Sequence, residues 1–257
     1  MKSVVLIKQV PEAPSIRGEA GGAGSVESDS KSVTNPYDHF AIEEGLKTRE
    51  SHGGEVTALT LGPETAVESL REALAMGANH AVHLKDDAFE GLDASGAAAV
   101  LAAGVEKVGE VDLVFVGRQT IDTNTALTGP MVAQRLGMTL LTEVFRVDEI
   151  DQEAGTICVE RLLEGGLQVV KGRLPALLAM TKDSNEPRFA SILGIRKASR
   201  APVTEWGAGD LGVEAASRTQ VTGMSIPPAR PGGELLQGEP EELAETLVAR
   251  LAEAKLI

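Results

Sequence analysis

The sequence predicts an α/β fold in which helices cover both faces of a parallel sheet. Short runs of β-branched and aliphatic residues are typical of strands that are buried on both sides. Amphipathic segments of helical length alternate with these runs, which indicates βαβ units. Ligands of such folds bind at the carboxyl ends of the strands. The expected strands are 4–7, 56–61, 81–84 and 112–117.

The helices expected between these strands have recognisable starts. One runs from Asp38 through Lys47, and a second begins at Gly62-Pro63, where proline is tolerated in the first turn. Asp93 is placed to cap a third helix, in which apolar residues recur with helical spacing through Val108. Each helix would connect one strand of the sheet to the next.

The remaining segments depart from this alternation. Residues 11–34 are rich in glycine and serine and predict a long surface hairpin or loop. Residues 140–181 predict short antiparallel strands, followed by a buried strand at 174–180. Residues 203–257 predict an extended arm that ends in a helix beginning at Glu241.

Composition argues against several classes of protein. The net charge of −14 and an aromatic content of 3% disfavour nucleic acid as a partner. The single cysteine, Cys158, excludes an intrachain disulfide and suits a reducing cytoplasm, and it is expected to be a buried structural thiol. The four histidines lack metal-ligand spacing, so no metal site is expected. No apolar run is long enough to predict a membrane span.

The segment from Gly117 to Pro130 is the richest in polar side chains. It follows a buried strand, leads into a helix, and carries six hydroxyl or amide side chains and Asp122. Backbone N–H groups at such a helix start, helped by Thr and Asn donors, bind phosphate groups. The alternative is a capped strand-to-helix turn, because the same residue types are ordinary caps. Neither the dinucleotide-binding glycine fingerprint nor a P-loop occurs, so the usual equipment for nucleotide hydrolysis is missing.

A second informative segment runs from Lys182 to Arg200. It holds five basic and two acidic residues, although the chain as a whole is acidic. An apolar tip flanked by charges is typical of an interaction loop, whereas the alternative is a buried connector. The apolar residues of this segment are Phe189, Ile192, Leu193 and Ile195.

At these segments the sequence resembles the beta subunit of electron-transfer flavoproteins, and the resemblance extends over essentially the whole chain. It rests on blocks that occur in the family's order. The blocks are Ile7-Lys8-Gln9-Val10-Pro11, Asn35-Pro36 with Ala41-Ile42-Glu43-Glu44, Gly62-Pro63, Ala73-Leu74-Ala75-Met76-Gly77-Ala78, Gly117-Arg118-Gln119-Thr120-Ile121-Asp122, Val159-Glu160-Arg161 with Gly165-Gly166, and Leu174-Pro175-Ala176-Leu177-Leu178 leading to Asn185-Glu186-Pro187-Arg188.

The resemblance implies an adenine-nucleotide-binding domain, Rossmann-like and adenine nucleotide alpha hydrolase-like, over residues 1–182. It implies an electron-carrier subunit that is not itself an enzyme, in a heterodimer with a larger alpha subunit that holds most of the FAD. An adenine nucleotide is expected at the strand ends. Its contacts would be Leu6, Asn35, Pro36, Tyr37, Asp38, Leu61, Thr120, Ile121, Asp122, Thr123, Asn124, Thr125, Ala126, Thr128, Gly129 and Met131.

The resemblance also implies two regions of contact with other proteins. Residues 183–202 would recognise an acyl-CoA dehydrogenase or another flavin dehydrogenase, and a membrane quinone oxidoreductase is a further candidate partner. Ile192 would be the apolar anchor, and Arg188, Arg196 and Lys197 would supply steering charge. The arm, residues 203–257, would contact the alpha subunit.

What fills the nucleotide site stays open between AMP, as in the ordinary carriers, and a second FAD, as in the electron-bifurcating type. The start at 7–11, the residues 88–91 with Asp93 and Ser95, and Thr125 before Gly129-Pro130 resemble the bifurcating group. That group usually has Gly-Asp-Thr-Ala at 123–126, whereas this chain has Thr-Asn-Thr-Ala.

Two departures from related patterns add expectations. Leu162 stands where the family usually has a glutamate that meets an arginine of the mobile flavin domain, so that contact is expected to be absent or replaced. An unrelated enzyme such as an ATP pyrophosphatase would need a Ser-Gly-Gly phosphate loop after the first strand, where this chain has Pro11-Glu12-Ala13-Pro14. The sequence therefore disfavours the pyrophosphatase interpretation.

Overall fold

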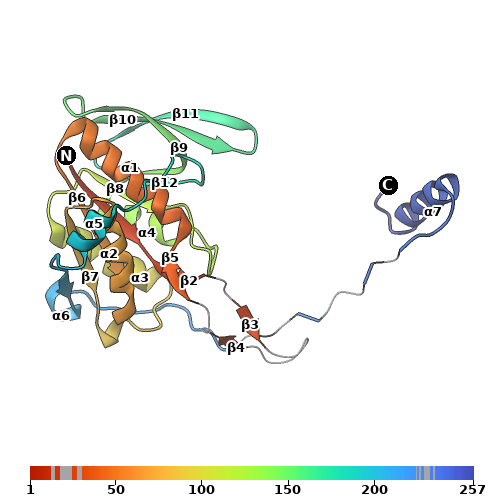
Figure 1. The fold of residues 1–257 in the computed structure, drawn as a ribbon, viewed down its shortest axis with the longest axis horizontal. Coiled ribbons are helices and arrows are strands. Elements are labelled where there is room, and N and C mark those ends of the chain that lie inside the picture. Colours follow the sequence, from red (N-terminus) through yellow and green to blue (C-terminus); the bar gives the residue numbers. More distant parts are fainter. Residues whose placement is uncertain are drawn as a thin grey trace. The chain divides into compact units, whose positions relative to one another are not determined.

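The computed structural model describes residues 1–12, 15–17, 25–27, 31–223 and, within 225–257, all but 226, 229–231 and 234. The chain divides into two units, one of Met1–Ser15 with Val26–Thr222 and the other of Ile16–Ser25 with Gly223–Ile257. The first unit contains a nine-stranded sheet (Figure 1), in the order β11-β10-β9-β12-β8-β1-β6-β7-β13. The strands are β1 Lys2–Ile7, β6 Glu55–Leu61, β7 His80–Leu84, β8 Leu113–Gly117, β9 Thr139–Asp151, β10 Thr156–Leu163, β11 Gly166–Arg173, β12 Ala176–Met180 and β13 Thr204–Trp206.

Most of this sheet is parallel. Every neighbouring pair from β9 to β13 runs in the same direction, whereas β10 and β11 extend the sheet as an antiparallel hairpin. The expected parallel α/β fold and its four predicted strands are therefore confirmed. The antiparallel strands expected between 140 and 173 are longer than predicted, whereas the buried strand expected at 174–180 begins only at Ala176. Strand β9 pairs with both the parallel strand β12 and the antiparallel strand β10.

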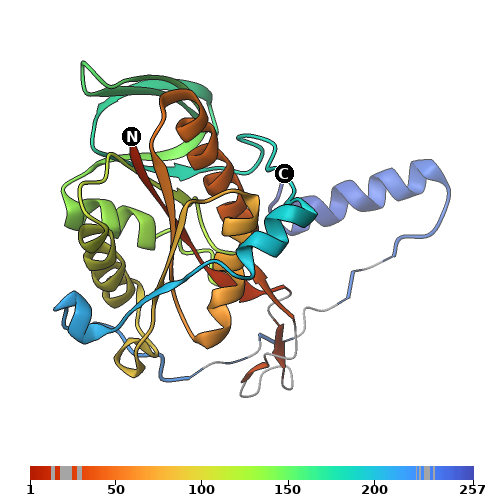
Figure 2. The same cartoon turned by 60° about the vertical axis from the view of Figure 1, so that its left-hand side comes forward.

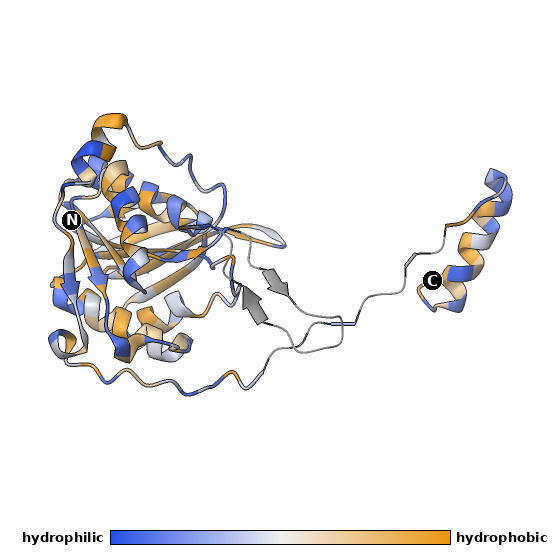
Figure 3. Cartoon of the chain, turned by 60° about the horizontal axis from the view of Figure 1, so that its bottom comes forward, coloured by the Kyte–Doolittle hydropathy of each residue, from blue (hydrophilic) through white to orange (hydrophobic). Residues whose placement is uncertain are grey.

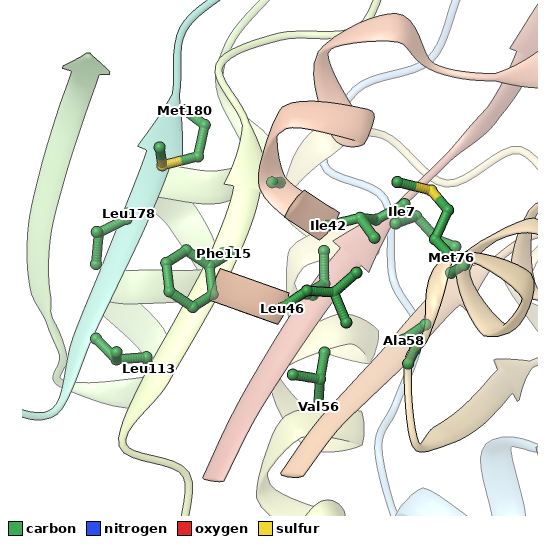
Figure 4. Close-up of a cluster of buried hydrophobic side chains, with 14 of the residues drawn as sticks. Ile7, Ile42, Leu46, Val56, Ala58, Met76, Leu113, Phe115, Leu178 and Met180 are labelled. Atoms are coloured by element: carbon green, nitrogen blue, oxygen red, sulfur yellow. The ribbon is translucent and has the colours of Figure 1, made fainter. Parts of the chain in front are cut away.

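Helices cover both faces of the sheet. Residues of α1 and α2 pack with Val5, Ile7 and Phe115 on one face, and Figure 4 shows Ile42 and Leu46 of α1 in this cluster. Residues of α3 and α4 pack with Val4 and Leu6 on the other face. The helices are α1 Pro36–His52, α2 Val67–Met76, α3 Ala94–Val108, α4 Thr128–Leu136, α5 Ile192–Ala198, α6 Ala208–Leu211 and α7 Pro240–Glu253, with 3₁₀ turns η1 Glu64–Ala66 and η2 Asp87–Phe89.

Several helix boundaries follow local chemistry. Asp93 caps α3 as predicted, because its Oδ1 accepts a hydrogen bond from the N–H of Gly96 at 2.8 Å. The helix expected from Asp38 begins two residues earlier, at Pro36, where proline suits the first turn. The segment at 183–202, expected to be a loop, contains α5, and the arm expected at 203–257 contains β13 and α6 before its final helix. Cys158 is half-buried, so the expectation of a buried thiol is wrong.

The long excursion after β1 contains two pairs of short strands where it is described. Strand β2, Gln9–Pro11, pairs antiparallel with β5, Ser32–Thr34, and β3, Ser15–Arg17, pairs with β4, Ser25–Glu27. The glycine-rich part of the predicted loop, residues 18–24, lies outside the described residues.

The second unit contains α7, which is amphipathic. Figure 3 shows hydrophobic and hydrophilic residues side by side along this helix, and Leu247 and Val248 are about half exposed. Among the described helices, none has both the length and the apolar character that crossing a membrane requires. The division of the chain at residues 182 and 202, and the contact of the arm with an alpha subunit, stay predictions.

Candidate nucleotide-binding site

The strand order changes direction at β1. From β1 the chain passes to β6 and β7 on one side, and then returns to place β8 on the other side of β1. Ligands of doubly wound sheets bind in the crevice at such a switch point, outside the carboxyl ends of the strands. Here those ends are Ile7 and Gly117, and several of the predicted site residues lie next to them.

Asn35 joins the start of α1 to the loop that follows β8. This side chain is fully buried, and its Nδ2 donates to Oδ1 of Asp38 at 2.8 Å and to the carbonyl of Gln119 at 2.9 Å. Its Oδ1 accepts from the N–H of Ile121 at 3.2 Å. Asn35 therefore ties the start of α1 to the loop after β8 through three hydrogen bonds within the protein.

Asp38 completes this clamp. Its Oδ2 accepts from the N–H of Lys8, directly after β1, at 2.7 Å. Burial raises the pKa of Asp38 to about 7, although hydrogen bonds from Asn35, Lys8 and the backbone of Gly117 act in the opposite direction. Because these bonds connect the ends of β1 and β8 to α1, we call Asn35 and Asp38 the switch-point clamp.

Two glycines allow the elements at the switch point to approach one another. A Cβ at Gly117 would lie 2.3 Å from Oδ1 of Asp38 and 2.7 Å from Cβ of Tyr37. A Cβ at Gly129 would lie 2.9 Å from Cγ1 of Val116, so α4 packs closely on β8. Only glycine fits at Gly117 without moving the clamp.

The loop between β8 and α4 carries most of the predicted contacts. Nζ of Lys8 lies 2.6 Å from Oδ2 of Asp122. Partial burial raises the pKa of Asp122, but hydrogen bonds from Lys8 and Thr120 and the charge of Lys8 act together in the opposite direction, so the pKa lies below the ordinary value. Asn124 and Ala126 have positive φ angles of 52° and 54°, a conformation that non-glycine residues adopt infrequently. The loop thus leaves the strand on a defined path.

The start of α4 has no side-chain cap in the part of the chain that the structure describes. Leu127 is the N-cap residue and, among the described residues, no side chain makes the cap hydrogen bond. The choice between a phosphate site and an ordinary strand-to-helix turn stays a prediction, although Leu127 makes no side-chain cap. Thr125 is exposed and Thr128 is half-buried at the same end. The unsatisfied N–H groups of a helix start, with hydroxyl donors beside them, suit a phosphate.

The structure separates the other predicted contacts into two places. Leu6, Leu61 and Met131 lie on the α3 and α4 face of the sheet. Pro36 and Tyr37 instead line a cavity of about 480 Å³ on the α1 and α2 side. The cavity is lined by Pro36, Tyr37, His39, Phe40, Glu72, Met76, Lys182, Pro187, Arg188, Phe189 and Ala190.

This cavity contains an ion pair that sequence reasoning missed. Nε2 of His39 lies 3.1 Å from Oε1 of Glu72, and Oγ1 of Thr34 donates to Oε2 of Glu72 at 2.5 Å. The hydrogen bond between His39 and Glu72 raises the pKa of His39 and lowers that of Glu72. The three residues come from α1, α2 and β5, so no local sequence pattern indicates the pair.

The segment predicted to recognise a partner is exposed. Ile192 and Leu193 are 77% exposed and Phe189 is 98% exposed, so the alternative of a buried connector is wrong. Arg188 is less available than predicted, because its guanidinium binds Glu43 at 2.8 Å and Glu50 at 2.5 Å. These two hydrogen-bonded carboxylates raise the pKa of Arg188. Recognition of a partner by this segment stays a prediction.

Two further expectations concern single features. Leu162 lies opposite Leu167 across the β10 and β11 pair, and the side chains are 45% and 56% exposed, so an apolar pair occupies the place of the family's glutamate. Within the described ranges, no group of three His, Cys, Asp or Glu side chains is arranged to hold a metal ion. The expectation that no metal binds stays a prediction.

Together the parallel sheet, its switch point at β1 and the helices on both faces define a doubly wound α/β protein of the Rossmann-like class. Residues 24–211 match the model of the electron transfer flavoprotein domain. The chain therefore belongs to the electron transfer flavoprotein family.

Several relatives are similar over most of their length. The chain is 44% identical to protein FixA of Azorhizobium caulinodans, over 87% of this chain and 81% of the relative. It is 40% identical to the caffeyl-CoA reductase-Etf complex subunit CarD of Acetobacterium woodii, over the whole of both chains. It is 38% identical to the electron transfer flavoprotein subunit beta of Thermoanaerobacterium thermosaccharolyticum, over 98% of both. The chain is thus a beta-type subunit of a family that acts in flavin-linked electron transfer.

Proposed function

We propose that the chain forms a heterodimer with an electron-transfer flavoprotein alpha subunit and binds an adenine nucleotide in the crevice between β1 and β8. The observation that carries this proposal is the switch-point clamp beside the uncapped start of α4. The clamp holds three segments at the strand ends in a defined position, and the helix start supplies N–H groups that need an acceptor. Loops held in fixed positions and N–H groups without acceptors, together at one switch point, suit a nucleotide site.

We assign different roles in nucleotide binding to the residues of the crevice. The N–H groups of Thr128 and Gly129 and the hydroxyls of Thr125 and Thr128 would hold phosphate oxygens. Leu61 and Met131, both half-buried, would supply apolar surface. The side chains of Asn35 and Asp38 are already hydrogen-bonded within the protein, so we assign them the role of holding the loops.

In this proposal, electron transfer is an activity of the heterodimer and not of this chain alone. FAD, shared with the alpha subunit, supplies the redox chemistry when it is bound, and this chain would act as a carrier subunit without an enzymatic reaction of its own. We propose that it docks an acyl-CoA dehydrogenase or another flavin dehydrogenase, with a membrane quinone oxidoreductase as a further candidate.

We also propose a cytoplasmic location, which rests on the single cysteine.

A second candidate function is the beta subunit of an electron-bifurcating complex, with a second FAD in place of AMP. The relative CarD, whose name gives it as a subunit of a reductase-Etf complex, supports this candidate through identity along the whole chain. The exposed residues Thr123 and Asn124 stand where that group usually has glycine and aspartate, which supports AMP instead. The two candidates share the same crevice.

The test of the nucleotide site is the double variant Thr125→Val with Thr128→Val, purified as the heterodimer. Each lost hydrogen bond to a charged phosphate should weaken binding by about 1.5–3 kcal/mol. The bound nucleotide is released by denaturation and quantified by chromatography. The matched control replaces two exposed threonines elsewhere, Thr65 and Thr204, with valine. Occupancy equal to that of the control would mean that this loop does not bind phosphate.

A further inference from the structure

The exposed apolar residues of the recognition segment lie on a helix and not on a loop. Helix α5 comprises seven residues, and its Ile192, Leu193 and Ile195 are 77%, 77% and 54% exposed. A helix this short is marginal in water by itself, because nucleation of a helix is costly. The order of α5 must therefore come from contacts with the rest of the molecule.

Helix α2 supplies those contacts, and Figures 1 and 2 show α5 lying beside it. Gly194 lies so close to α2 that a Cβ would be 2.5 Å from the carbonyl oxygen of Ala75. Ala198, at the end of α5, is only 3% exposed. The face of α5 that carries Gly194 and Ala198 thus packs against the rest of the domain, while the face that carries Ile192 and Ile195 is exposed to solvent.

Arg71 of α2 fastens the carboxyl end of α5. Its Nη1 donates to the carbonyl of Ala198 at 2.6 Å and also to the carbonyl of Ala201. Carbonyl groups at the end of a helix lack hydrogen-bond donors within the helix and carry partial negative charge. A guanidinium supplies both the donors and a compensating positive charge. At the other end, Oγ of Ser191 accepts from the N–H of Gly194 at 3.0 Å. Both ends of this short helix are therefore capped by hydrogen bonds from side chains or to side chains.

The charge around α5 indicates the kind of partner surface that fits it. The chain carries a net charge of −14, yet the last turn of α5 presents the exposed basic residues Arg196 and Lys197. Opposite charges at the rim of an interface steer association, and an apolar anchor at its centre supplies affinity. The complementary surface is an apolar depression bordered by carboxylates on a partner protein.

We infer that Arg71 and Gly194 are positioning residues, which hold α5 as a preformed docking helix for such an acidic-rimmed partner. The inference rests on the proposed function, since it assumes that α5 docks a redox partner. A helix that is ordered before contact spares the complex the entropic cost of ordering it during association. Loosening α5 should therefore weaken docking even though no residue that touches the partner is changed.

The test uses the full heterodimer and an acyl-CoA dehydrogenase reduced by its acyl-CoA substrate as the probe. Arg71→Ala and Gly194→Ala are compared with Ile192→Ala and with wild type. Hydrogen exchange of the Ile195 and Ser199 amides, both bonded within α5, should accelerate at least about tenfold in the two positioning variants. The apparent KM for the dehydrogenase should rise several-fold, with the maximal rate unchanged.

Two controls separate positioning from general damage. Gly209→Ala adds a methyl group where nothing lies within 4 Å. Arg135→Ala removes an arginine that bonds the carbonyl of Ser95 on the other face of the sheet, at 3.3 Å. Both should leave α5 exchange and KM unchanged. Arg71→Lys keeps the charge and one donor group, and it should recover part of the lost protection.

The outcomes are distinct. If Ile192→Ala raises KM while both positioning variants keep wild-type KM and wild-type exchange, the inference is overturned and docking stands. If Ile192→Ala leaves KM unchanged, the docking part of the proposed function fails, and the exchange rates alone then decide whether Arg71 and Gly194 hold α5. A common fall in the melting temperature of more than a few degrees in both positioning variants, with exchange accelerated throughout the domain, would also overturn the inference.

Discussion

Replacing Asn35 with alanine should open the crevice without touching the residues that we assign to phosphate binding. The variant removes three hydrogen bonds, including those to the carbonyl of Gln119 and the N–H of Ile121. A buried polar group left without a partner costs about 1–3 kcal/mol, so two orphaned backbone groups set an upper range of roughly 2–6 kcal/mol. Gln119 and Ile121 are only half-buried, and water would restore part of the loss. We therefore expect about 2 kcal/mol.

The matched control is Asn79→Ala at the opposite edge of the sheet. Oδ1 of Asn79 accepts from the N–H of Val56 and from Nη1 of Arg49, both at 3.0 Å. Urea denaturation measures the unfolding free energy of each variant, and chromatography measures the nucleotide that each heterodimer releases. Both variants should lose stability, but only Asn35→Ala should lose nucleotide. Equal nucleotide content at comparable stability would refute the role of Asn35 in shaping the crevice.

Two further perturbations test other parts of the site. Gly117→Ala should lower the unfolding free energy by about 1–3 kcal/mol or more through overpacking against Asp38, and it should reduce nucleotide content, which a urea titration with nucleotide analysis checks. His39→Gln should cost at most about 1 kcal/mol, because the pair with Glu72 is partly exposed. Folding raises the pKa of His39 from 6.5 and lowers the pKa of Glu72 from 4.5. The pair therefore makes its full contribution to the unfolding free energy between about pH 4.5 and pH 6.5. Its contribution is lost as pH rises through the raised pKa of His39, so the variant and wild type should melt alike at high pH and differ near pH 6. A difference that persists at high pH would contradict this account.

The strand ends and the polar loop after β8 could be predicted from the sequence, because both depend on local pattern. A buried aliphatic run followed by Thr, Asn and Asp residues and then by Gly129-Pro130 indicates a strand, a loop and a helix start. The alternation of strands and helices then places that loop at one edge of a parallel sheet. These inferences need no knowledge of distant contacts.

The clamp and the docking helix could not be predicted, because distant residues form them. Asn35 and Gln119 are 84 positions apart, and Arg71 and Ala198 are 127 positions apart. Helix α5 is too short for a clear period, and it contains Gly194, which local propensity disfavours within a helix. Packing on α2 outweighs that preference, since only a glycine permits such a close approach.

Counting the adenine-containing molecules in the purified heterodimer shows directly whether the crevice between β1 and β8 holds a nucleotide. Denaturation releases all bound cofactors, which chromatography and absorbance then identify and quantify against protein. We expect two adenine-containing molecules for each heterodimer: the FAD shared with the alpha subunit, and either AMP or a second FAD in the crevice between β1 and β8. A heterodimer that is active in electron transfer but releases only one FAD and no other adenine nucleotide would contradict this expectation.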